Sequence, residues 1–139
     1  MTRLEQIIEE FQDMEPEFRL ELLLDYAEAF PPLPERYRDE EEQKSHMVHE
    51  CQTPVSLWVE VADERVHIYA DVPPQSPTVR GFLAMLMEAF NGASPQAVLD
   101  APEDVLKRTG LEQAIGMRRL FGLSVIYRRI KEVVAVNLM

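Results

Sequence analysis

A chain of 139 residues can bury one ordinary hydrophobic core, and its 46% apolar and 28% charged residues are typical of a folded, water-soluble protein. We therefore expect a single domain over residues 1–139, with no membrane-spanning segment. The net charge of −11 argues against nucleic acid as a partner, because phosphates bind basic surfaces. It favours a protein partner with a basic patch. Alternatively, the excess charge serves only to keep the protein soluble.

The first 44 residues predict two helices and a connector. Thr2 and Glu5 have the spacing of a capping box, and four apolar residues follow at helical intervals. Pro16 suits an early helical position, and a second apolar stripe continues until Pro31-Pro32 ends it. We expect these helices to form a hairpin. Residues 33–44 carry a run of charge and almost nothing to bury, so we interpret them as an exposed connector.

The hydrophobic pattern has a period of two beyond residue 54. Alternating apolar residues in 55–61 and again in 66–70 predict two strands, and residues 62–64 between them predict a turn. Only one face of this hairpin is consistently apolar, so it must pack against helices. The expected fold class is α+β, with a small antiparallel sheet of about three strands packed on one face by helices.

Helices dominate the rest of the chain. Ser76-Pro77 supplies an N-cap and an N1 proline for a strong helix that Asn91-Gly92 ends. Ser94-Pro95 opens a short helix, and further helical turns follow on both sides of Gly110. The last helix directs an apolar stripe toward the core, and we expect its charged side chains to point elsewhere: Arg128, Arg129 and Lys131.

Cys51 is the only cysteine, and it lies where a polar, turn-like stretch meets the first strand. A thiol in that position can be presented to a partner as a nucleophile or a carrier. The adjacent Glu50 disfavours a thiolate, whereas Arg119 or a protonated His49 nearby would favour it. The N-terminus has carboxylates where a signal peptide needs an apolar run, so we expect a cytoplasmic protein with a reduced thiol.

Two other interpretations of the thiol remain open. His46, His49 and Cys51 could ligate zinc, but a structural site needs a fourth ligand that the sequence does not supply, so solvated histidines are favoured. A small cysteine hydrolase could use His67 or His49 as its base, although a chain this short leaves little room for a substrate cleft. No glycine-rich phosphate loop is present, and the helical lysines Lys107 and Lys131 look exposed, which gives little support to a pyridoxal site.

Two arginines lie near glycines early in helices: Arg80 beside Gly81, and Arg119 three residues before Gly122. A guanidinium in such a position can orient a thiolate or a partner's carboxylate, and glycine permits close approach of the backbone. Alternatively, the arginines are solvated and the glycines ease helix packing. Spacing alone favours this second interpretation.

Three motifs occur in order: Glu50-Cys51-Gln52-Thr53-Pro54, residues 78–82 (TVRGF) and residues 119–123 (RLFGL). Together they resemble the SufE family of sulfur-acceptor proteins over almost the whole chain. The resemblance implies a SufE/IscU-like α+β fold and assigns Cys51 as the persulfide acceptor. It also implies partner-docking or thiolate-orienting roles for Arg119, Arg80, Gln52 and Glu50.

The same resemblance implies a sulfur carrier that activates a partner, and not a stand-alone enzyme. The partner is a pyridoxal-phosphate cysteine desulfurase (SufS-like), and the sulfur passes on to an iron–sulfur scaffold (SufBCD-like). No metal or cofactor of its own is implied. The alternative function, from a different functional class, is a non-catalytic adaptor that binds a protein. The chain departs from the commoner family pattern Gly-Cys-Gln-Ser, because Glu50 replaces the glycine and Thr53 the serine, and Gln75-Ser76-Pro77 replaces the usual acidic residues before the central helix.

Overall fold

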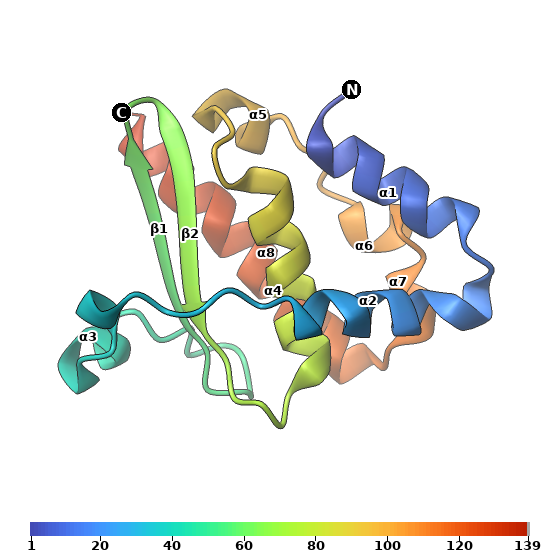
Figure 1. The fold of residues 1–139 in the computed structure, drawn as a ribbon, viewed down its shortest axis with the longest axis horizontal. Coiled ribbons are helices and arrows are strands. Elements are labelled where there is room, and N and C mark those ends of the chain that lie inside the picture. Colours follow the sequence, from blue (N-terminus) through green and yellow to red (C-terminus); the bar gives the residue numbers. More distant parts are fainter. Residues whose placement is uncertain (139) are drawn as a thin grey trace.

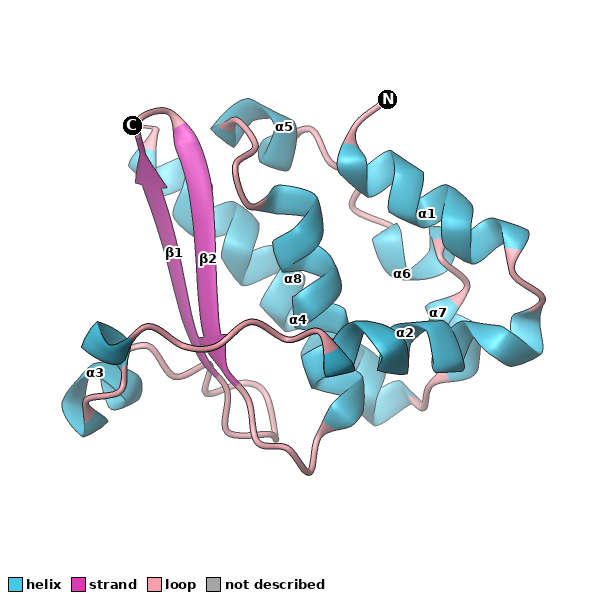
Figure 2. Cartoon of the chain, viewed as in Figure 1, coloured by secondary structure: helices cyan, strands magenta, loops and turns pink. Residues whose placement is uncertain are grey.

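The computed structural model describes residues 1–138, in which one long β-hairpin lies at one side of the fold and packs against a group of helices (Figures 1 and 2). Two 3₁₀ turns, Pro16–Phe18 and Glu35–Tyr37, accompany the regular elements. These elements are α1 (Arg3–Asp13), α2 (Arg19–Glu28), α3 (Glu40–Ser45), β1 (Ser56–Ala62), β2 (Arg65–Asp71), α4 (Pro77–Phe90), α5 (Pro95–Leu99), α6 (Val105–Arg108), α7 (Leu111–Ala114) and α8 (Met117–Asn137). The expected α+β class is confirmed.

Helix α4 lies at the centre of the fold and packs against α1, α2, β2 and α8 (Figure 1). Eleven of its 14 residues are buried, so the helix is covered on nearly every side. An apolar surface all round is what a fully enclosed helix requires. The position of α4 fixes the site described below, because its N-terminus lies at the loop that carries the cysteine.

The two N-terminal helices form as predicted. The capping box is complete: the Thr2 hydroxyl accepts from the Glu5 N–H at 3.1 Å, and the Glu5 carboxylate accepts from the Thr2 N–H at 3.3 Å. After the turn at Pro16–Phe18 the chain folds back, and the rings of Phe11 and Tyr26 stack with centroids 6.3 Å apart. Both helices pack against α4, which explains their apolar stripes.

The sheet has two strands within residues 1–138, so the expectation of about three strands is wrong. β1 and β2 pair antiparallel along their whole lengths. Asp63 and Glu64 form the predicted turn with positive φ values of 53° and 62°, as a two-residue hairpin with the natural strand twist requires. In place of a third strand, Met47 forms a single isolated bridge with Ser56, because the chain then turns into the loop that carries the cysteine.

Residues 33–44 are largely exposed, as expected, but they are more than a bare connector. They cross the outer face of the hairpin and include α3 (Figure 1). The buried Tyr37 ring stacks on Trp58 with centroids 4.8 Å apart, and His46 stacks on Trp58 at 5.3 Å. Trp58 also donates from Nε1 to Glu42 at 3.0 Å. The strand face that we expected to be polar is therefore covered around Trp58.

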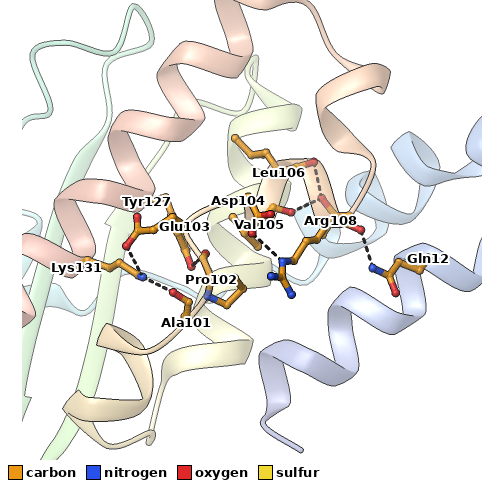
Figure 3. A network of polar contacts seen from close by, with 11 residues as sticks. Gln12, Ala101, Pro102, Glu103, Asp104, Val105, Leu106, Arg108, Tyr127 and Lys131 are labelled. Atoms are coloured by element: carbon orange, nitrogen blue, oxygen red, sulfur yellow. Dashed lines mark hydrogen bonds and ion pairs between the residues drawn. The ribbon is translucent and has the colours of Figure 1, made fainter.

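Helix α8 runs along the hairpin and ends beside the hairpin turn, while its first turn lies at the opposite end, near the cysteine (Figure 1). Lys131 of this helix is 7% exposed, which corrects the expectation that it points away from the core. Its ammonium donates to the Ala101 carbonyl and to Glu103 (Figure 3), and also to the carbonyl of Leu99. No helix in residues 1–138 has the length and apolarity needed to cross a membrane.

Lys131 therefore fastens the segment after α5 to α8, and its loss should destabilise the fold. We expect Lys131→Met to lower the free energy of unfolding by about 2 kcal/mol, because two carbonyls lose their donor in a poorly solvated place. Urea denaturation measures this change. Lys107→Met, which removes an exposed lysine from α6, is the matched control; equal losses in both variants would contradict the structural role.

Candidate functional site

The cysteine lies in a short loop whose base is fixed by the backbone. Val48 and Val55 are buried, and the Val48 N–H donates to the Val55 carbonyl at 2.8 Å. Within the loop, the Cys51 N–H donates to the Val48 carbonyl at 3.2 Å. The loop is thus closed at its ends, and its tip holds the Cys51 thiol in a half-buried position.

The thiol opens into a surface pocket of about 300 Å³ between this loop and the first turns of α4 and α8. Within residues 1–138, the lining contains two ionisable side chains besides the thiol, and both are arginines. This composition stands out in a chain with 25 Asp and Glu residues and a net charge of −11. The lining residues are Cys51, Gln52, Thr53, Gln75, Ser76, Pro77, Thr78, Val79, Arg118, Arg119 and Gly122.

Gly122 of α8 lets the thiol lie directly on the helix backbone. A Cβ atom at this buried position would be 3.3 Å from Cys51 Sγ, which is tighter than an ordinary contact. Gly122 and Arg119, three residues apart in the sequence, thus both belong to this pocket. The glycine makes room for the sulfur, and the arginine supplies positive charge.

The N-terminus of α4 faces the pocket without a side-chain cap. We expected Ser76 to cap this helix, but its side chain makes no capping hydrogen bond. Its hydroxyl lies instead 3.5 Å from the Thr53 hydroxyl in the cysteine loop. The N–H groups at the start of a helix carry partial positive charge. The pocket therefore has a second source of positive potential besides its arginines.

The first turn of α8 carries Arg118 and Arg119 and no acidic residue. Cations at a helix N-terminus oppose the helix dipole, which makes this a locally unfavourable arrangement. Both side chains are exposed and line the pocket, and the thiolate-orienting or docking role of Arg119 stays a prediction. Sequence reasoning missed Arg118, although two consecutive arginines opening a helix without a carboxylate were a readable signal.

Glu50 pairs with Arg129 of α8, with a separation of 3.1 Å between Oε2 and Nη2. The charge that we expected to act on the thiol is therefore partly neutralised, and Arg129, which we expected to point away from the core, lies at the surface against the cysteine loop. Arg129 and Gly122 are seven residues apart and so lie on one face of α8. The cysteine loop is thus attached to the helix at two points, by Glu50 and by the thiol.

Breaking this ion pair should loosen the loop and make the thiol react faster. The pair is partly exposed and worth about 0.2–1 kcal/mol, so we expect Glu50→Gln or Arg129→Gln to speed alkylation of Cys51 by iodoacetamide up to about fivefold. Combining both changes should add little. The charge-swapped pair Glu50→Arg with Arg129→Glu should restore the slow rate. Arg128→Gln is the control, and an equal acceleration there would refute the attachment.

Arg80 is not among the residues that line the pocket. Its guanidinium donates to the Val72 carbonyl at 2.7 Å and lies 4.3 Å from the centroid of the Phe30 ring. These contacts hold the β2–α4 connection in place. Gly81 lies against the backbone of Leu23 in α2, so this glycine eases helix packing. Of the predicted site residues, the pocket thus brings together Cys51, Gln52 and Arg119, with Glu50 at its edge.

The described residues give no geometric support to the hydrolase or metal interpretations. No histidine in residues 1–138 lines the pocket: His49 is exposed in the cysteine loop and outside the lining, His67 is in the hairpin, and His46 stacks on Trp58. Within the same residues, no group of three or more His, Cys, Asp or Glu side chains is arranged to hold a metal ion. Without a histidine among the described residues of the lining, acyl transfer lacks its usual proton acceptor in the pocket.

The fold and the site together define a small α+β protein that presents one thiol in a cationic surface pocket. Comparison with known proteins makes this specific: the family profile SufE, described as an Fe-S metabolism associated domain, matches residues 5–134. The chain therefore belongs to the SufE family. The family connects it with sulfur transfer in iron–sulfur metabolism, in which SufE proteins interact with a cysteine desulfurase.

Individual relatives agree with this assignment. An uncharacterized SufE-like protein of Mycobacterium tuberculosis is 33% identical over 129 residues, which cover 92% of this chain and 88% of the relative. An uncharacterized SufE-like protein of Synechocystis is 28% identical over 90% of this chain and 76% of its own length. The solution structure of a hypothetical protein from Thermus thermophilus superposes with a TM-score of 0.83 at 36% identity, covering 99% of this chain and 98% of that one.

Proposed function

We propose that this protein takes sulfane sulfur from the persulfide of a SufS-like cysteine desulfurase onto Cys51 and passes it on for iron–sulfur cluster assembly. The observation that carries the proposal is the pocket itself: a half-buried thiol beside Arg118 and Arg119, with no carboxylate in the lining. A persulfide or thiolate is an anion, and cations and free helix N–H groups favour anions.

The transfer is a thiol exchange at sulfur. The Cys51 thiolate attacks the terminal sulfur of the donor persulfide, and a new S–S bond forms on Cys51. The donor's S–S bond breaks, its electron pair stays on the donor's cysteine, and that thiolate takes up a proton from solvent. The number of S–S bonds is unchanged, so no oxidant or reductant is consumed. Arg118 and Arg119 hold the anionic sulfur in the pocket during the exchange.

The pocket also suits the second transfer. Cys51 lies at a loop tip on the surface, so the same persulfide can be offered to a downstream acceptor such as a SufBCD-like scaffold. We place both steps in the cytoplasm, where a lone thiol is kept reduced. Removing sulfur from the donor frees its cysteine for the next turnover, and the protein thereby activates the desulfurase without being an enzyme by itself.

Mass spectrometry tests the proposal. The protein is incubated without oxygen with a SufS-like desulfurase and cysteine, and its intact mass and peptides are then measured. We expect a gain of sulfur on the peptide that contains Cys51, and no gain in protein whose thiol was first blocked with iodoacetamide. Sulfur found only on the desulfurase, or gained equally by the blocked protein, would refute the proposal.

A further inference from the structure

Helix α8 exposes two large apolar side chains in its first two turns. Met117 is 82% exposed and Phe121 is 60% exposed. They are four residues apart, so they lie on one face of the helix and form a pair. An exposed methionine alone is ordinary, but an exposed pair that includes an aromatic residue has the composition of interface centres.

The apolar pair adjoins the thiol pocket directly. At 3.6 residues per turn, Arg118 projects between the direction of Phe121 and that of Gly122, which contacts the cysteine. One surface therefore runs from the apolar pair, across Arg118, to Cys51. A macromolecule that brings its own sulfur to Cys51 covers this surface.

The local charge of this surface is opposite to that of the whole chain. The net charge of −11 led us to expect a basic partner, but charges beyond about 8–10 Å are largely screened at physiological salt. Within residues 1–138, the charged side chains that line the pocket are Arg118 and Arg119, the first turn of α8 has no acidic residue, and the nearby Glu50 is paired with Arg129. An acidic surface complements the two arginines of the lining.

We propose that Met117, Phe121 and Arg118 form the docking patch for the sulfur donor, which presents an apolar socket rimmed by carboxylates. This inference rests on the proposed function and names the surface that serves it. Phe121 and Met117 enter the socket, and Arg118 faces the rim. The apolar pair supplies affinity and Arg118 supplies orientation, so that the donor persulfide arrives at Cys51 in line for attack.

Binding of a SufS-like desulfurase to single variants tests the patch. We expect Phe121→Ala to weaken binding about tenfold, as for a residue at an interface centre, and Met117→Gln to weaken it several-fold. Phe18→Ala is the matched control, because Phe18 is 45% exposed on another element. Added salt should weaken binding of the wild type more than that of Arg118→Gln.

A small sulfur donor separates this inference from the proposed function. Inorganic polysulfide needs no docking, so Phe121→Ala should accept sulfur from it at the wild-type rate while accepting slowly from the desulfurase. Equal binding by Phe121→Ala and Phe18→Ala, with sulfur transfer intact in both, would overturn the patch and leave the function standing. A wild type that takes no sulfur from the desulfurase would overturn both.

Discussion

Cys51→Ser should lose sulfur transfer completely while still binding the desulfurase. Serine has nearly the same size and fits the space beside Gly122, but its hydroxyl forms no persulfide. We therefore expect desulfurase turnover with this variant to fall to the rate of the desulfurase alone. Alanine production from cysteine measures that turnover, and a binding titration confirms that the variant still forms the complex.

The control for this experiment is Thr53→Ser, a change in the same loop to the family's commoner residue. It retains the hydroxyl that faces Ser76, and turnover should stay at the wild-type rate. The same two variants distinguish a sulfur carrier from a non-catalytic adaptor. If Cys51→Ser stimulates the desulfurase as strongly as the wild type, binding alone activates the enzyme, and Cys51 is not the sulfur acceptor.

The predictions that succeeded rest on short-range signals. The capping box at Thr2, the turn at Asp63 and Glu64, and the serine cap at Ser94 all involve residues within three positions of each other. Such signals act through the local backbone, so the sequence alone contains them. The placement of Cys51 at a loop before a strand is also local, and the structure has it there.

Most predictions that failed involve partners far apart in the chain, and even the local cap expected at Ser76 is absent, with its hydroxyl lying near Thr53, 23 positions away. Residues 33–46 cover Trp58. This segment has too few apolar residues for its sequence to predict that packing. Glu50 meets Arg129 across 79 positions, and no periodic pattern records such a pair. The site also combines local and long-range features. The motif around Cys51 could be found in the sequence, whereas only the three-dimensional structure shows that the N-termini of α4 and α8 meet beside it.

Gly81→Ala is expected to cause a large loss of stability, because α2 and α4 approach too closely there for a methyl group. A Cβ atom at this position would lie 2.3 Å from the carbonyl oxygen of Leu23 and 2.9 Å from its Cγ. The oxygen belongs to the backbone of α2 and cannot rotate away, so the two helices must separate. We expect a net loss of about 2–3 kcal/mol, after the helix-propensity gain of about 1 kcal/mol for alanine.

Gly122→Ala is the matched control, since it makes the same change inside another helix. The new Cβ meets only Cys51 Sγ, at 3.3 Å, and a side chain on a surface loop can move by a few tenths of an ångström. Its free energy of unfolding should therefore stay within about 1 kcal/mol of the wild-type value, while the alkylation rate of Cys51 changes. Urea denaturation compares the two variants. Equal stabilities would mean that α2 and α4 do not touch at Gly81, and the central position of α4, which brings its N-terminus to the thiol, would then be wrong.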